Sequence, residues 1–289
     1  MNHDQSYREQ NAHLLPKVIY KFRSWKNPLH QKVLTQNQLY CASPAELNDP
    51  MDCRNTIDFS LLDTKEKVKE YVQRVANESS DNQPIDSNEN EQLLRSAEIQ
   101  LASPFGRAKH QIEFNAMFSD MMDSQYGVVS FSTEWKQKTL WERYGDHHRG
   151  YALGFDEAIL RNWLRQDYTL FAKGGVVSYH EKLPKIDPLN YDIPTNVFLM
   201  THTKTKNWSD ENEYRLTKHF GVLFGEDFIP TVNDRVVKFP SETVCELVIG
   251  MICPEADKNE MITIGKEKKL PVYQVVLKDD ATLDRQRLA

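Results

Sequence analysis

The chain has 289 residues, of which 39% are hydrophobic and 10% aromatic, so it can bury a sizeable core. Acidic side chains outnumber basic ones by 42 to 36, which gives a formal net charge of −6. This balance argues against non-specific binding to nucleic acid, which needs a basic face. No apolar run approaches the roughly 20 residues that span a bilayer. Residues 1–16 form a polar tail without the apolar stretch of a secretory signal, so we expect a cytoplasmic protein with no membrane contact.

The four cysteines fit that location. None of them has the C-x-x-C spacing of a zinc knuckle or a redox motif. We therefore expect buried free thiols in a reducing compartment, at Cys41, Cys53, Cys245 and Cys253.

The first half of the chain begins with short β patterns and then becomes helical. Residues 17–24 have the composition of a strand, and the stretch after Asn27 predicts a helix followed by a short strand at Gln38–Ala42. The turn formers around Asn48, Asp49 and Pro50 predict a rigid loop. Apolar spacing of three and four residues predicts a helical insertion over about 63–125. Inside it, the acidic stretch 77–92 has no apolar face and is expected to be a mobile loop.

The second half is rich in strand patterns. Helices are expected at about 195–205 and after Pro254, and a final strand after Leu270. Residues 17–289 are therefore expected to form a single α+β domain. Its core would be a mixed, mostly antiparallel sheet that includes Val18–Phe22, Val128–Phe131, Tyr151–Phe155, Glu213–Thr217 and Val244–Ile249.

The stretch "NWSDENEYRL" places Glu211, Glu213 and Arg215 at every second position. On a strand these three side chains would share one face, and two carboxylates about 7 Å apart repel unless a cation lies near them. One interpretation is an ion-pair ladder with Arg215 and a neighbouring strand. The other is a cleft in which one glutamate stabilises positive charge while the other orients a nucleophile.

An arginine on the first predicted strand is a second candidate. Arg23 follows Tyr20 in the stretch "YKFRSW", and a fixed guanidinium suits bidentate capture of a phosphate or carboxylate. The alternative is that Arg23 pairs with Asp49 or Asp52 of the turn-rich loop.

The stretch 128–156 combines polar and aromatic residues. Ser132 ends a predicted strand, and Trp141 and Tyr144 lie three apart on the helix that follows, so they meet on one surface. His147 and His148 come where that helix ends. Adjacent histidines cannot reach one metal from a regular helix, and no carboxylate has ligand spacing, so no metal site is expected.

These stretches together resemble domain of unknown function 2971, a family of bacterial and phage-associated proteins. The resemblance rests on "IYKFRS", "LYCASPAELNDPMDC", the block from Ser130 to Asp156 and "NWSDENEYRL", and extends from about Val18 to Ile252. This resemblance does not imply any particular activity.

A more distant resemblance, to ADP-ribosyltransferases of the arginine-serine-glutamate class, bears on mechanism. The order of their motifs is met by Arg23, by "SFST" with Ser132, and by Glu211-Asn212-Glu213, although Phe131 departs from the pattern. The resemblance implies that NAD is the substrate and that Glu213 stabilises the cation formed as nicotinamide leaves. It implies that Glu211 positions the acceptor, Arg23 meets the pyrophosphate and Ser132 orients Glu213. Binding roles would also fall to Tyr20, Trp141 and Tyr144, the last two by stacking on nicotinamide.

Three functions follow from these readings. The first is an NAD-consuming enzyme, either an ADP-ribosyltransferase or an NAD glycohydrolase, acting as a toxin or phage-defence effector. Its acceptor would be a protein or a nucleic acid, and a partner protein could regulate it. The second is a nuclease-like enzyme that holds a metal with Glu211, Glu213 and Asp49. The third is a non-catalytic domain that recognises a phage or host component.

Overall fold

The structure is a computed structural model that describes residues 15–80, 87–168, 172–190, 192–221 and 228–289. The chain divides into two compact units, each described by itself here. The first consists of Met1–Leu47, Gln125–Tyr179 and Lys204–Ala289, and the second of Asn48–Ser124 and His180–Thr203. Most of the polar tail, residues 1–14, lies outside the described residues.

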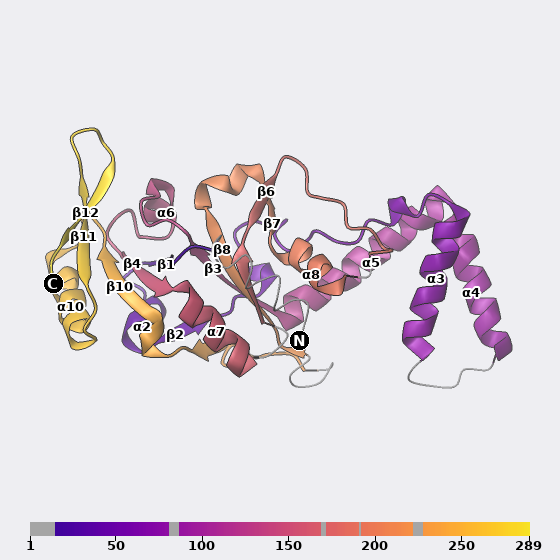
Figure 1. Cartoon of the computed structure of the whole chain (residues 1–289), viewed down its shortest axis with the longest axis horizontal. Helices are drawn as coiled ribbons and strands as arrows, with labels where there is room; N and C mark the ends of the chain where they lie inside the picture. The colour runs from indigo at the N-terminus through magenta and orange to yellow at the C-terminus, as the bar shows by residue number, and fades with distance from the viewer. Residues whose placement is uncertain (1–14, 81–86, 169–171, 191, 222–227) are drawn as a thin grey trace. The chain divides into compact units, whose positions relative to one another are not determined.

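The first unit is built on a mixed eight-stranded sheet (Figure 1). Its strand order is β12-β11-β10-β4-β1-β3-β8-β5, and every neighbouring pair is antiparallel except β10 with β11. The strands are β1 (Val18–Arg23), β3 (Tyr126–Ser132), β4 (Tyr151–Asp156), β5 (Ala172–Val176), β8 (Glu213–His219), β10 (Val244–Ile249), β11 (Val272–Leu277) and β12 (Leu283–Arg287). The predicted α+β class and all five segments predicted for the sheet are confirmed.

Two smaller sheets and several helices accompany the large sheet. Strand β2 (Gln38–Tyr40) pairs with β9 (Val236–Lys238), and β6 (Ser178–His180) pairs with β7 (Thr203–Thr205). The helices along the sheet-forming segments are α2 (Pro28–Thr35), η2 (Pro44–Glu46), α6 (Lys138–Arg143), α7 (Glu157–Tyr168), η5 (Lys206–Glu211), η6 (Ser241–Thr243) and α10 (Glu255–Glu267).

The sheet buries apolar side chains on both faces because other elements pack on each of them. One face packs against α2, α7 and α10 and includes Ile19, Phe131 and Tyr151. The other face includes Phe22 and, from α6, the buried Trp141. The alternation along each strand assigns its side chains to one face or the other.

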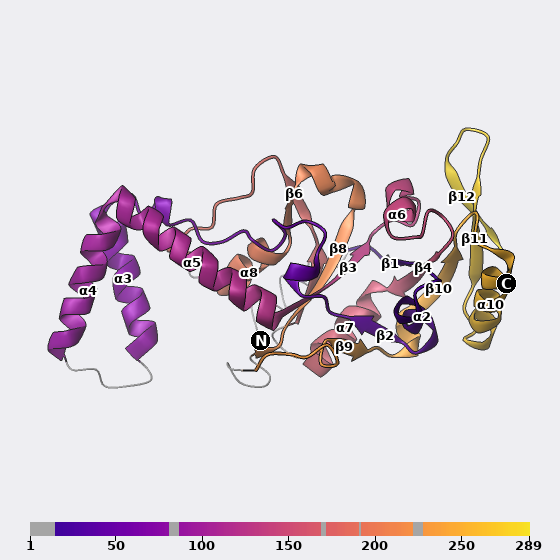
Figure 2. The same ribbon diagram turned by 180° about the vertical axis from the view of Figure 1, so that it is seen from behind.

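The second unit is mainly helical. Figure 2 shows α3 (Lys65–Ser80) beside α4 (Ser87–Ala102), which is followed by α5 (Pro104–Gln125). The unit also contains η3 (Phe59–Leu61) and α8 (Ile193–Thr201). Phe59, Leu62, Val68, Val72 and Leu101 form its core.

The helical stretch expected over about 63–125 is present. The prediction of an acidic loop at 77–92 is wrong at both ends of that range. Residues 77–80 belong to α3 and residues 87–92 to α4. The remaining positions, 81–86, lie outside the described residues. A polar segment with good helix formers extends a helix that its neighbours have already nucleated, even without an apolar face of its own.

All four cysteines are free, as expected, and three of them are buried; Cys245 is half-buried. No helix in the described part of the chain has the length and apolarity needed to cross a bilayer.

Candidate functional site

Three neighbouring strands carry the three sequence motifs. Arg23 ends β1, Ser132 ends β3 and Glu213 begins β8, and these strands are adjacent in the order β1-β3-β8. Ser132 is the registered partner of both Tyr20 and Glu213. The fold therefore brings together segments that lie more than 80 residues apart in the sequence.

The pairing between β1 and β3 is short. These strands share one registered pair, Tyr20 with Ser132, whereas β3 and β8 share seven. Farther along β3, Val128 exchanges backbone hydrogen bonds with Ala42 instead of with β1. The buried Lys21 ammonium donates to the carbonyl oxygen of Ser130, so its side chain reaches across from β1 to β3.

Glu211 does not lie on the strand, contrary to the alternation expected for this stretch. It ends the 3₁₀ helix η5, and Asn212 follows in the left-handed region with φ 42° and ψ 51°. Strand β8 starts only at Glu213. Asparagine is one of the few residue types that adopts this conformation readily, so the turn has a local cause.

The two glutamates nevertheless meet at one buried cation. Lys204 of β7 places its ammonium 3.0 Å from Oε2 of Glu211 and 3.2 Å from Oε2 of Glu213. Arg215 donates to Glu213 through Nε at 2.8 Å and through a terminal nitrogen at 2.9 Å. The ion pair between Arg215 and Glu213, one of the two interpretations of the sequence, is therefore present.

This network is buried. Arg215 is 0% exposed and Glu213 is 2% exposed. Burial alone raises the pKa of the Glu213 carboxyl, but the charges of Arg215 and Lys204 outweigh it and hold the pKa at about 2. The Ser130 side chain adds a hydrogen bond that favours the ionised form. Glu213 is thus a fixed anion throughout the physiological range.

Glu211 belongs to the same buried network and has two further partners from the segment around α6. The Tyr144 hydroxyl donates to its carboxylate at 3.0 Å, and Arg143 approaches the same oxygen at 3.5 Å. The Ser132 hydroxyl donates to the backbone carbonyl oxygen of Glu211 at 2.9 Å. Ser132 therefore positions the turn before Glu213, whereas the resemblance implied that it orients the carboxylate of Glu213 itself.

Arg23 lies apart from these residues. Its registered partner Tyr151 belongs to the face covered by α2, whereas Ser132 and Glu213 alternate onto the other face. The guanidinium donates to the Phe22 carbonyl oxygen at 3.3 Å, and its Nε is buried without a hydrogen-bond partner. No contact joins it to Glu213 in the described structure.

The surroundings of Arg23 are basic. Burial lowers the pKa of its guanidinium, and no carboxylate among the described residues forms an ion pair with it. The nearby His30 has its pKa lowered to about 4, first by burial and then by the charges of Arg23 and Lys21. The Nδ1 atom of His30 is also buried without a partner. A group of this kind suits an anion.

Two of the predicted binding residues belong to the core. Trp141 is 0% exposed, donates from Nε1 to the Trp135 carbonyl oxygen at 2.8 Å, and packs edge-on against Phe22. The Tyr20 hydroxyl donates to Glu246 at 2.7 Å. Stacking or hydrogen bonding of either side chain with a ligand would require these contacts to break, whereas Tyr144 is only half-buried and donates its hydroxyl to Glu211.

The two histidines after α6 form a strained turn. Asp146, His147 and His148 all have positive φ, between 50° and 64°, and both histidines approach the carboxylate of Glu142. His148 stacks on Trp141, with ring centroids 5.9 Å apart. Among the described residues, no group of three or more His, Cys, Asp or Glu side chains is placed to hold a metal ion.

The sequence patterns missed the cation that joins the glutamates. In the sequence, Lys204 and Lys206 form a small basic cluster before Trp208 of the kind that is usually exposed to solvent. In the structure, Lys204 is only 6% exposed. Its ammonium lies 4.7 Å from the centre of the Trp208 ring. The tryptophan four residues later was the only local signal that this lysine is buried.

Comparison with known proteins links one part of this site to a family. The family model described as "Protein of unknown function (DUF2971)" matches residues 140–216. Residues 140–216 resemble DUF2971. The DUF2971 match contains Tyr144, Lys204, Glu211 and Glu213, so the carboxylate network lies inside it and Arg23 lies outside it. No curated protein and no solved structure matches the chain.

Proposed function

We propose that the protein consumes NAD, as an ADP-ribosyltransferase or an NAD glycohydrolase. The observation that carries the proposal is a buried carboxylate, Glu213, which neighbouring cations keep ionised with a pKa of about 2. It stands at the start of β8, directly opposite Ser132 of the adjacent strand. A fixed anion in a low-dielectric site can stabilise a ribosyl cation far more than the same anion in water.

The reaction would break the bond between ribose C1 and the nicotinamide nitrogen, and nicotinamide would leave with the bonding electron pair. Water or an acceptor nucleophile then bonds to C1 and loses a proton. Glu211, which also contacts Tyr144 and Arg143, would position that nucleophile and accept its proton. The basic group around Arg23 would meet the pyrophosphate, because its guanidinium has no carboxylate partner in the described chain.

The proposal carries a structural requirement. Lys204 and Arg215 neutralise Glu213 in the present arrangement, and Arg215 binds both of its carboxylate oxygens, so NAD must displace Lys204 and loosen the pair with Arg215 for Glu213 to face the ribose. The ligand must also reach from the Arg23 side of the sheet to the Glu213 side.

The same ion pairs favour a second candidate. If Lys204 and Arg215 remain bound to the glutamates, the network is structural and the protein is a non-catalytic recognition domain. A role as a cytoplasmic toxin or phage-defence effector would follow from the first candidate, and a role as a sensor of a phage or host component from the second. No observation favours a metal-dependent nuclease, since Lys204 lies where a metal between the two glutamates would be held.

Incubation of the purified protein with NAD, with chromatographic detection of nicotinamide, tests the proposal. We expect release of nicotinamide that survives a chelator such as EDTA. NAD that binds but is never cleaved would support the recognition domain. Cleavage that stops when the chelator is added would contradict a mechanism based on protein carboxylates alone.

A further inference from the structure

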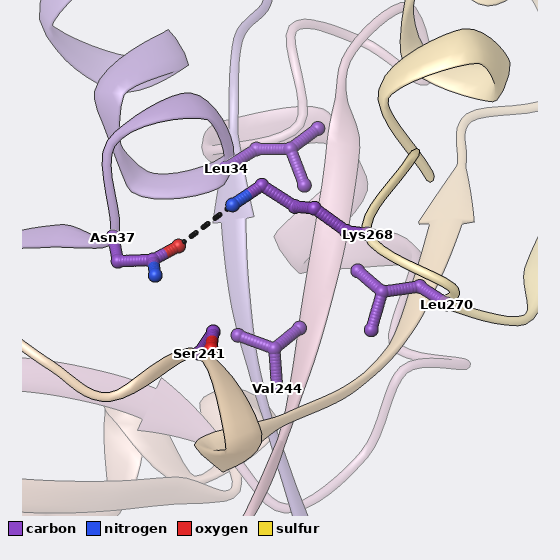
Figure 3. A pocket seen from close by; sticks show the side chains of 6 residues that line it. All are labelled: Leu34, Asn37, Ser241, Val244, Lys268 and Leu270. Atoms are coloured by element: carbon purple, nitrogen blue, oxygen red, sulfur yellow. Dashed lines mark hydrogen bonds between the residues drawn. The ribbon is translucent and has the colours of Figure 1, made fainter. Parts of the chain in front are cut away.

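A pocket in the first unit lies among segments that are distant in the sequence (Figure 3). It has a volume of about 180 Å³. Its walls come from the end of α2, from η6 and the start of β10, and from the segment between α10 and β11. The lining residues are Leu34, Asn37, Ser241, Val244, Lys268 and Leu270.

The lining separates apolar from polar groups. Leu34, Val244 and Leu270 supply branched aliphatic side chains, and Figure 3 shows them around the Lys268 chain. The polar groups are one amide, one hydroxyl and one ammonium, and no carboxylate lines the pocket. The pocket therefore combines an apolar wall with a single positive charge.

That charge is not neutralised by the surrounding protein. The Lys268 ammonium donates to Oδ1 of Asn37 at 2.9 Å, and this is the one hydrogen bond it makes within the described structure. It forms no ion pair with a carboxylate there. An ammonium has three N–H donors, so two of them are available to a ligand.

The polar edge of the pocket is rigid. Asn37 follows α2 in the left-handed region, with φ 53°, and its carbonyl oxygen accepts from the Phe239 amide at 3.0 Å. On the other side, the Lys268 amide caps α10 by donating to the carbonyl oxygens of Ile264 and Lys266. Both polar side chains thus start from backbone positions that hydrogen bonds hold in place.

We propose that this pocket binds a small aliphatic monocarboxylate. The carboxylate would pair with the Lys268 ammonium and accept from the Asn37 amide or the Ser241 hydroxyl, and the alkyl chain would lie on Leu34, Val244 and Leu270. At about 30 Å³ per water the pocket equals roughly six waters, which limits the acid to about four to six carbons. This site shares no residue with the carboxylate network, so it does not depend on the proposed reaction.

Saturation-transfer NMR titration of the full-length protein with sodium hexanoate tests the proposal. Hexan-1-ol and hexylamine serve as comparison ligands, because they have the same six-carbon skeleton without the carboxylate. We expect hexanoate to bind at millimolar concentration and at least tenfold more tightly than either probe, because only the carboxylate can pair with the ammonium. Lys268→Gln should weaken hexanoate at least tenfold, and Lys266→Gln, which alters an exposed lysine of the same helix, should leave it unchanged.

A third variant checks the apolar wall. Val244→Phe should abolish hexanoate binding by filling the pocket, and thermal unfolding shows whether each variant is folded. The proposal is overturned if hexanoate fails to bind the wild type, if hexan-1-ol binds as tightly, or if a folded Lys268→Gln or Val244→Phe variant retains full affinity.

Discussion

Glu213 and Arg215 lie two residues apart on β8 and form a bidentate ion pair, with nitrogen–oxygen distances of 2.8 and 2.9 Å. Residues at this spacing project from the same face of a strand, so the pair forms within one element. Because Arg215 is 0% exposed, removal of its partner would leave an uncompensated charge in the core. The pair therefore ties any chemistry of Glu213 to the stability of the sheet.

The first prediction concerns acid. The pKa of Glu213 falls from 4.5 to about 2 on folding, so its contribution is fully present above pH 4.5 and is lost as the pH drops through about 2. The shift corresponds to about 3 kcal/mol. We expect Glu213→Gln to lower the free energy of unfolding by that order at pH 7 and to flatten its dependence on pH between 4.5 and 2.

Chemical denaturation of both proteins across this pH range is the measurement. Glu255→Gln is the matched control, because Glu255 pairs with Lys258 at the surface and is 72% exposed. Equal acid sensitivity in wild type and Glu213→Gln would show that Glu213 is not held ionised by the fold.

The second prediction concerns the shared cation. Lys204→Met leaves Glu211 and Glu213 facing each other without the ammonium between them and should cost about 3 kcal/mol of stability. Adding Glu211→Gln should recover part of this loss, because it removes one of the two charges. A double-mutant cycle from denaturant unfolding measures the coupling. Lys266→Met, at an exposed position of α10, is the control. Strict additivity at Lys204 and Glu211 would refute the shared site.

The third prediction concerns the turn before β8. Asn212 has φ 42°, a conformation that glycine adopts freely and β-branched residues resist. We expect Asn212→Gly to preserve the melting temperature within a few degrees and Asn212→Val to destabilise the protein by about 2 kcal/mol. Both variants remove the same side-chain amide, so an equal loss in the two would mean that the amide, and not the backbone conformation, matters.

The fourth prediction separates ligand binding from stability at Arg23. The guanidinium is partly buried without a carboxylate partner, so Arg23→Met should leave the melting temperature unchanged or raise it. If the basic group binds the pyrophosphate, the same change should weaken NAD at least tenfold in calorimetry. Arg149→Met alters an exposed arginine and serves as the control. Unchanged NAD affinity in Arg23→Met would remove Arg23 from the site.

The sequence was sufficient to predict the interior of the sheet. Continuous apolar runs such as those at Val244–Ile249 and Tyr151–Phe155 indicate buried strands, and both proved to be so. Strand β12, with the sequence "LDRQR", was missed because it shows neither an apolar run nor alternation. It is held by antiparallel pairing with β11, which no local pattern reveals.

The site was only partly predictable for a related reason. Alternation placed Glu213 and Arg215 on one face correctly, but it failed at Glu211, where a single left-handed residue interrupts the strand. The burial of Lys204 depends on the pairing of β6 with β7 and on Trp208, which are tertiary contacts. Arg23 and Ser132 project from opposite faces of the sheet because of the register between β1 and β3. The order of the motifs along the chain does not encode that register.

Nicotinamide release from NAD by wild type, Glu213→Gln and Glu211→Gln, each expressed per folded molecule, tests the proposed activity most directly. If Glu213 stabilises the ribosyl cation, Glu213→Gln should reduce release by about 10² to 10³ in its folded fraction. Glu211→Gln should retain most hydrolysis and lose transfer to an acceptor, since water needs less positioning than a specific nucleophile. A Glu213→Gln protein that melts earlier yet keeps full turnover per folded molecule would contradict the mechanism and leave the glutamates with a structural role alone.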